Sequence, residues 1–173
     1  MAKSIILIPS RLAATRLPNK PLLKINNKTI ISHVYDKAIE SKIGDVWVAT
    51  CDKAISDEIK KNGGKSILTG SHHNTGTDRI SEALTKIDID DIDYVINLQG
   101  DEPLIDIDDI KNLNNQAVAN NSDLATLACE INPEEKDKYS NPNIVKVITK
   151  DNLSNNRSSI ALNFERVSNS NIR

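Results

Sequence analysis

The sequence carries three cations in a proline-containing segment that directly follows its first apolar run. This segment, PSRLAATRLPNKPL over residues 9–22, contains Arg11, Arg16 and Lys20. Its prolines discourage helix, so we expect a loop. Arginine offers a planar fork of donors to phosphate oxygens and lysine adds a compact point charge, so the loop could hold a nucleoside triphosphate. A solvated surface loop is the alternative that the charges alone also allow.

A carboxylate follows a later apolar run, in the sequence NLQGDEP over residues 97–103. In an extended chain Gln99 and Asp101 point to the same side, and Gly100 between them permits a ligand to approach the backbone closely. Asp101 is therefore a candidate ligand for Mg²⁺, which proteins hold with one or two carboxylates plus substrate phosphates. The alternative is that residues 101–103 only form a turn and cap the next helix.

A turn that leads into a helical pattern has the sequence NTGTDR, residues 74–79. Its Gly76 and the free amides of the helix start could meet a base or ribose, with Arg79 one helical turn further on. Thr77 is an equally good candidate for an ordinary helix N-cap, so the spacing leaves both interpretations open.

These three segments belong to a chain in which strand patterns alternate with helical patterns. The predicted strands are residues 4–8, 46–50, 66–69 and 94–98. The predicted helices are residues 29–41, 53–62 and 77–87. This order predicts an α/β fold, a mostly parallel sheet with helices on both faces. Ligands of such open sheets bind beyond the carboxyl ends of the strands, so the segments after Ile8, Thr69 and Leu98 are the places where a ligand site is expected.

The second half of the sequence has weaker patterns. Further strands are predicted at residues 124–128 and 144–149, and the acids of residues 106–109 are predicted to begin a helix, where they complement its dipole. After Lys150, asparagine and serine dominate. We therefore predict a nucleotide-binding domain over residues 1–150. Residues 151–173 are predicted to be the start of an incomplete, loosely ordered part with one short strand at residues 159–164.

Composition excludes several classes of protein. A length of 173 residues fits one domain, and a net charge of -2 gives no sign of the basic surface that nucleic-acid binding needs. The apolar run Ile5–Ile8 is too short for a signal peptide or a membrane span, so we expect a cytoplasmic protein that binds no membrane. Cys51 and Cys129 are isolated, and we interpret both as small buried hydrophobic residues, with no zinc site. His72 and His73 have no partner that the sequence identifies, and receive no role.

Four motifs, in this order along the chain, resemble the CMP-Kdo synthetase family, the cytidylyltransferases that activate 3-deoxy-manno-octulosonate (Kdo). They are RLAATRLPNKPL at residues 11–22, NTGTDR at 74–79, NLQGDEP at 97–103 and NPNIVKV at 141–147. One motif alone would be weak evidence, but four in register are specific.

The resemblance implies a Rossmann-like fold of the nucleotide-diphospho-sugar transferase type. It implies that Arg11, Arg16 and Lys20 hold the triphosphate of CTP and act in catalysis, and that Asp101 is a catalytic residue that binds Mg²⁺. The further contacts with CTP that it implies are Thr75, Gly76, Thr77, Arg79 and Gln99.

The same resemblance implies the reaction and its setting. The anomeric hydroxyl of Kdo attacks the α-phosphate of CTP and pyrophosphate leaves, as a step of lipopolysaccharide biosynthesis, in a homodimeric enzyme. This chemistry needs positioning and charge neutralisation more than a protein nucleophile, which agrees with a site built from arginine, lysine and a metal.

The sequence also departs from the family pattern. Ala14 replaces a serine, Cys51 replaces an aspartate, and Asn19 replaces a glycine whose left-handed conformation asparagine can also adopt. Family members are longer, and the segments that supply their sugar contacts, part of the dimer interface and a second metal carboxylate have no counterpart here. We therefore expect these 173 residues to bind CTP weakly and to transfer little CMP.

Two other functions stay open at this point. Within the same class of enzyme, the related acylneuraminate cytidylyltransferases are the alternative, and the intact QGDEP sequence favours Kdo over them. From a different class, the alternative is a CTP-binding remnant without catalytic activity.

Overall fold

The structure is a computed structural model that describes residues 2–13, 17–132, 134–153 and 158–166. The chain forms two compact units, residues 1–114 and residues 115–173. The predicted division into a nucleotide-binding domain and a later part at residue 150 stays a prediction.

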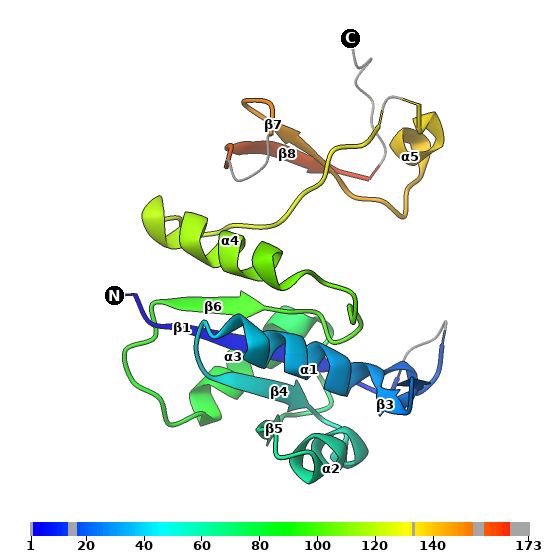
Figure 1. The fold of residues 1–173 in the computed structure, drawn as a ribbon, viewed down its shortest axis with the longest axis vertical. Helices are drawn as coiled ribbons and strands as arrows, with labels where there is room; N and C mark the ends of the chain where they lie inside the picture. Colours follow the sequence, from blue (N-terminus) through cyan, green and yellow to red (C-terminus); the bar gives the residue numbers. More distant parts are fainter. Residues whose placement is uncertain (1, 14–16, 133, 154–157, 167–173) are drawn as a thin grey trace. The chain divides into compact units, whose positions relative to one another are not determined.

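A four-stranded parallel sheet forms the centre of the first unit (Figure 1). Its strands, in spatial order, are β5 (Ser66–Leu68), β4 (Val46–Thr50), β1 (Ser4–Ser10) and β6 (Tyr94–Asn97). Every residue of β1 is buried, because an inner strand of a parallel sheet is covered on both faces. All the pairings within this sheet are parallel, which confirms the predicted α/β fold.

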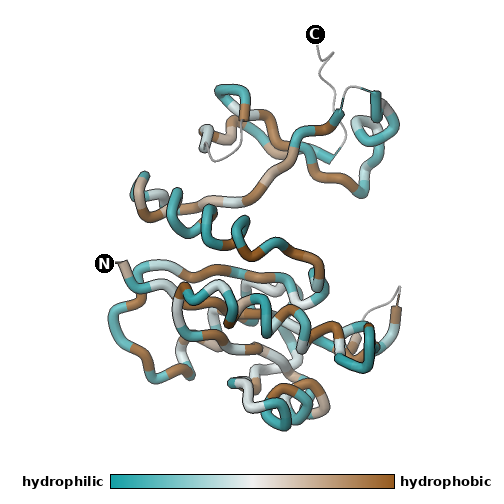
Figure 2. The backbone as a smooth tube through the Cα atoms, viewed as in Figure 1, coloured by the Kyte–Doolittle hydropathy of each residue, from teal (hydrophilic) through white to brown (hydrophobic). Residues whose placement is uncertain are grey.

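Helices cover both faces of this sheet. They are α1 (Ile30–Ser41), α2 (Lys53–Lys61) and α3 (Gly76–Lys86). α1 and α2 pack in one cluster with Ile6 and Ile8, whereas α3 packs in a second cluster with Leu7 on the opposite face. Burial of each such side chain contributes about 1.5–3 kcal/mol. Hydropathy follows this arrangement, since the strands are largely hydrophobic and the helices mix hydrophobic and hydrophilic residues (Figure 2).

A short hairpin sets the start of α1. Strands β2 (Lys24–Ile25) and β3 (Lys28–Thr29) pair antiparallel around Asn26 and Asn27, whose positive φ angles of 48° and 65° suit asparagine in a tight hairpin turn. Thr29 then caps α1, because its side chain accepts a hydrogen bond from the Ser32 amide. The hairpin therefore joins the first loop to α1 within a few residues.

Helix α4 (Ile107–Ala119) begins with Asp108 and Asp109 in its first turn, as predicted for this acidic segment. Its Ile110 is buried in the same cluster as Ile6 and Ile8 of β1. No helix among the described residues is both long and apolar enough to cross a membrane.

The second unit has an antiparallel pair of strands. The elements are α5 (Lys136–Ser140), β7 (Lys146–Thr149) and β8 (Ala161–Glu165). β7 and β8 pair with each other, close to the strands predicted at residues 144–149 and 159–164. The strand predicted at residues 124–128 is wrong: these residues lie outside any strand, and Leu124 is 90% exposed. Apolar residues form a strand only where a neighbouring strand pairs with their backbone.

The two cysteines differ in their surroundings. Cys51 is half-buried at the end of β4, whereas Cys129 is exposed. The interpretation of Cys129 as a buried hydrophobic residue is therefore wrong.

Candidate functional site

The carboxyl ends of β1 and β6 meet at the edge of the sheet where the sequence predicts a site. The Leu98 amide donates to the Leu7 carbonyl over 3.1 Å, so pairing continues to the last residue before the NLQGDEP loop. A Cβ on Gly100 would lie 2.9 Å from the Pro9 carbonyl oxygen and 3.3 Å from Ser10 Cβ. Only glycine permits this approach, which brings the loop that carries Asp101 against the end of β1.

Lys20 and Asp101 form an ion pair at this edge, although 81 positions separate them in the sequence. Lys20 Nζ lies 2.6 Å from Asp101 Oδ2, and the side chains are 34% and 51% exposed. An exposed pair of this kind adds little to stability, so either partner can exchange the other for a ligand at small cost. The structure thus brings together two of the predicted catalytic residues.

The backbone before Lys20 fixes its position. Asn19 has a φ angle of 57°, the left-handed conformation predicted for the residue that replaces the family's glycine. A short 3₁₀ helix follows at Lys20–Leu22, with Pro21 buried. Lys20 therefore projects from an ordered turn.

The start of the first loop is held from the end of β4. The Leu12 amide donates to Asp52 Oδ2 over 2.8 Å, which places Arg11 beside this anchor with its side chain exposed. Arg16 lies outside the described residues, and its predicted contact with phosphate stays a prediction. Asp52 was missed from the sequence. A position directly before a helix is typical of an N-cap, yet the Asp52 side chain binds the loop and makes no cap.

Ser10 is a second residue that sequence reasoning missed. Its Oγ is buried and has no hydrogen-bond partner among the described residues. Because a buried hydroxyl normally finds a partner, the unused one beside Gly100 at the proposed ligand edge is a candidate donor to a ligand.

The loop before α3 reaches the same strand end. A Cβ on Gly76 would lie 3.1 Å from Pro9 Cγ, so this turn packs directly on the end of β1. Thr75 and Asp78 form a capping box, in which the Thr75 hydroxyl accepts from the Asp78 amide over 3.1 Å. The hydroxyl of Thr75 also donates to the Asp78 carboxylate, which lowers the pKa of that carboxyl. The N-cap is thus Thr75, and Thr77 lies within the first helical turn.

Two other predicted contacts have partners within the protein. Arg79 is only 3% exposed, and its Nη1 donates to Thr69 Oγ1 over 2.5 Å and to the Gly70 carbonyl over 3.1 Å. Gln99 is exposed, and its Nε2 donates to Asn97 Oδ1 over 3.0 Å. Arg79 therefore supports the loop after β5, and direct contact of either residue with a nucleotide stays a prediction.

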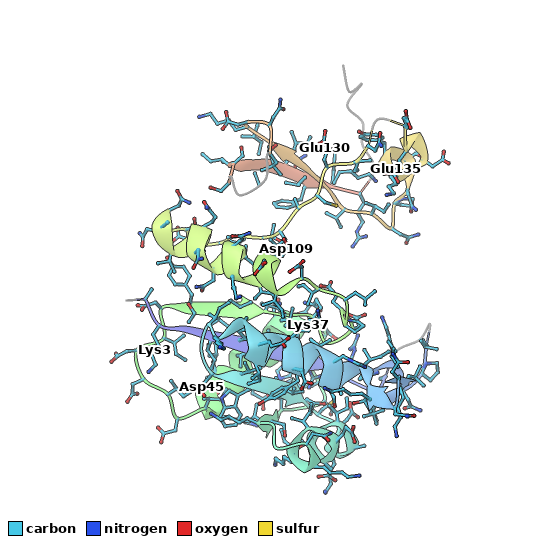
Figure 3. All side chains as sticks on the ribbon, viewed as in Figure 1. Lys3, Lys37, Asp45, Asp109, Glu130 and Glu135 are labelled. Carbon is cyan, nitrogen blue, oxygen red and sulfur yellow. The ribbon has the colours of Figure 1, made fainter. Side chains whose placement is uncertain are left out.

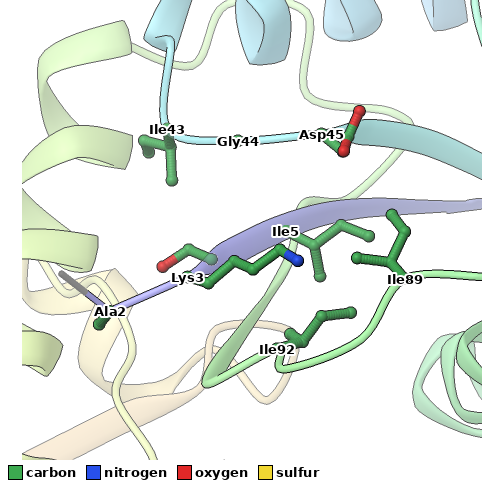
Figure 4. A pocket seen from close by; sticks show the side chains of 9 residues that line it. Ala2, Lys3, Ile5, Ile43, Gly44, Asp45, Ile89 and Ile92 are labelled. Carbon is green, nitrogen blue, oxygen red and sulfur yellow. The ribbon is translucent and has the colours of Figure 1, made fainter.

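A pocket of about 430 Å³ lies at the opposite end of the sheet, around the amino end of β1 (Figure 4). Ile89 and Ile92 line it together with Lys3 and Asp45, whose positions in the first unit are marked in Figure 3. The Asp45 carboxylate is already paired with Lys65. Ligands of open α/β sheets bind at the carboxyl ends of the strands. The edge with Lys20 and Asp101 is therefore a better candidate for the ligand site than this pocket.

Comparisons with known proteins identify the family of this chain. A family model described as Cytidylyltransferase matches residues 5–172. The chain is 46% identical over 151 residues to the 3-deoxy-manno-octulosonate cytidylyltransferase of Thermodesulfovibrio yellowstonii, covering 84% of this chain and 58% of that protein. It is 41% identical over 167 residues to the Francisella tularensis protein of the same name, covering 96% and 66%.

A solved structure of CMP:2-keto-3-deoxy-manno-octonic acid synthetase complexed with CTP matches with a TM-score of 0.79 and 34% identity, covering 96% of this chain and 65% of that one. A cytidylyltransferase from Leptospira borgpetersenii matches with a TM-score of 0.58 and 30% identity, covering 69% and 50%. The chain thus spans between half and two thirds of the length of these relatives. With nearly all of its residues matched by the family model, the chain belongs to the cytidylyltransferase family.

Proposed function

We propose that the protein acts as a 3-deoxy-manno-octulosonate cytidylyltransferase, which transfers CMP from CTP to Kdo in the cytoplasm, as a homodimer, for lipopolysaccharide synthesis. The relatives that carry this name and the similar structure solved with CTP support the proposal. The observation that carries it is the Lys20 and Asp101 pair at the carboxyl edge of the sheet.

The reaction forms a bond from the anomeric oxygen of Kdo to the α-phosphorus of CTP. It breaks the bond from that phosphorus to the oxygen that bridges to the β-phosphate, and the hydroxyl proton of Kdo passes to solvent. Arg11 and Lys20, with Arg16 outside the described residues, would neutralise the triphosphate and hold the leaving pyrophosphate. Thr75, Gly76 and Thr77 would face the nucleoside from the start of α3, where free amides point outward. The Ser10 hydroxyl would donate to the bound nucleotide at the end of β1.

The residues present fit a divalent metal such as Mg²⁺. Asp101 offers a hard carboxylate that is half exposed, and among the described residues it belongs to no cluster of three metal-ligating side chains. A site with one carboxylate, completed by phosphate oxygens and water, is the arrangement that Mg²⁺ accepts. When bound, Mg²⁺ supplies charge neutralisation at the α-phosphate and the pyrophosphate.

The ion pair also couples binding of the triphosphate to binding of the metal. When a triphosphate binds, Lys20 exchanges the Asp101 carboxylate for phosphate oxygens. The carboxylate then loses its cationic partner and becomes free for the metal. Because the pair is exposed, this exchange costs little.

Calorimetric titration with CTP and Mg²⁺ tests nucleotide binding by the 173 residues. We expect CTP to bind, and ATP to bind more weakly. If CTP does not bind, the proposed site is wrong. Transfer is tested in the longest reading frame that contains this sequence, by pyrophosphate release with Kdo or with an acylneuraminate. Pyrophosphate release only with acylneuraminate would assign that sugar as the substrate. CTP binding with no pyrophosphate release in the presence of either sugar would indicate a CTP-binding protein without transfer activity.

A further inference from the structure

Three metal-ligating side chains gather around the loop between β5 and α3. They are His72, His73 and Glu82, whose ligand atoms all lie within 4.8 Å of one another. Within the part of the chain that the structure describes, this is the one group of three or more such residues at that spacing. His73 Nε2 and Glu82 Oε2 are already in direct contact, and the two imidazole rings lie 4.3 Å apart between centroids.

The backbone holds this cluster in place. The Gly70 amide donates to both carboxylate oxygens of Glu82, over 2.9 and 3.1 Å. Arg79 Nη1 donates to the Gly70 carbonyl over 3.1 Å. A Cβ on Gly70 would lie 2.5 Å from the His72 ring, so that imidazole would have to move if Gly70 carried a side chain. Glu82 itself lies on α3, which gives this ligand a rigid support, whereas His72 and His73 lie on the loop before that helix.

The state of the side chains suits a metal. The His73 and Glu82 side chains are only 10% and 21% exposed, whereas His72 faces solvent and gives an ion access. A glutamate side chain is charged at neutral pH and can therefore bind a cation. Lys86 pairs with Oε1 over 2.5 Å, which leaves Oε2 facing the histidines.

We propose that His72, His73 and Glu82 form a binding site for a borderline-soft divalent metal of the Zn²⁺ class. Two imidazoles and one carboxylate are a ligand set that Zn²⁺ takes in sites where a fourth position stays open to water. Bonds of about 2.0–2.2 Å to the metal separate tetrahedral ligand atoms by about 3.4 Å, within reach of small side-chain rotations here. His73 can bind the metal only through a ring nitrogen that carries no proton.

This site is distinct in chemistry from the proposed Mg²⁺ ligand. Asp101 offers only oxygen, which Mg²⁺ prefers, whereas imidazole nitrogen selects Zn²⁺ and its neighbours in the transition series. The site consists of side chains from one loop and one helix, and metal binding there does not depend on the proposed function.

The test is titration of the untagged 173-residue chain with Zn²⁺ by calorimetry, and with Co²⁺ by visible absorption, which reports tetrahedral coordination. We expect one metal per chain. His72→Asn and His73→Gln should each weaken binding at least ~10- to 100-fold, the loss seen even for residues that only support metal ligands. His33→Asn is the matched control, because His33 lies near the start of α1 and bonds the Ile25 carbonyl.

His72→Asn decides the test, because His72 is exposed and its loss should leave folding intact. An unchanged metal affinity in this variant overturns the proposal, as does the absence of metal binding by the wild-type chain. Cys51 and Cys129 are present in every variant, so their contribution cancels in the comparison. Binding that persists in His72→Asn and disappears on alkylation of the thiols would assign the metal to the cysteines instead, and would also overturn the proposal.

Discussion

Gly100→Ala should damage the proposed site through the backbone, without removing any charged group. The added Cβ would lie 2.9 Å from the Pro9 carbonyl oxygen. Ordinary carbon to oxygen contacts are about 3.3–3.6 Å, so the loop or the end of β1 must move by about half an ångström. Forcing a methyl group into a packed position costs about 1–3 kcal/mol.

The same movement displaces Asp101 relative to Lys20, because Asp101 is the next residue along the loop. Disturbing the support of a metal ligand costs about 10- to 100-fold in metal affinity, so this shift should weaken Mg²⁺-dependent CTP binding by roughly 10-fold. Urea unfolding followed by fluorescence measures the stability of the first unit, since its Trp47 is the only tryptophan of the chain. Calorimetry measures CTP affinity.

Gly63→Ala is the matched control. Gly63 has a φ angle of 77° with nothing within 4 Å of an added Cβ, so alanine there strains only its own backbone. The cost is about 1–2 kcal/mol, similar to that at Gly100, but no neighbour moves. CTP affinity should be unchanged in this variant. If Gly100→Ala has wild-type stability, the packing argument is wrong. If it is destabilised like Gly63→Ala yet binds CTP normally, the Asp101 loop is not part of the site.

Further variants test the charges and the cap. Lys20→Ala should weaken CTP binding in a salt-sensitive way, whereas Lys53→Ala, which breaks a similar exposed ion pair on α2, should not. Equal CTP affinities of the two variants would mean that the first loop does not bind the nucleotide. Asp101→Asn should leave the fold intact and lower turnover in the longest reading frame by about 10²–10³, and an unchanged rate at saturating Mg²⁺ would exclude it as a metal ligand. Thr75→Ala should cost about 1 kcal/mol in urea unfolding, and no loss would mean that the cap is dispensable. The lowered pKa of Asp78 means that its stabilisation is complete above the ordinary value of 3.8 and is lost as the pH falls through the lowered value. The stabilities of wild type and Asp78→Asn, measured by circular dichroism as a function of pH, should therefore converge in acid. A difference in stability that stays constant with pH would contradict this.

The sequence predicted most elements of the first unit because their signals are local. β4 occupies the predicted residues 46–50, and α1 and α3 each begin and end within one residue of their prediction. The cap of α3 was assigned less well, since threonines flank Gly76 on both sides. Asp78 stands three residues after Thr75, the spacing of a capping box, and this signal would have selected Thr75.

Contacts between segments were predictable only as far as the topology determines them. Lys20 and Asp101 could be expected to share an edge, because both follow strands whose carboxyl ends lie side by side. Their direct contact depends on how closely the loops approach, which Gly100 permits. The His73 and Glu82 contact depends in the same way on Gly70, whose amide binds the carboxylate and whose missing side chain leaves room for His72. Glycine is required at such positions because another group occupies the space that a side chain would fill. That group comes from a distant part of the sequence, so no local sequence pattern identifies the requirement before the fold is known.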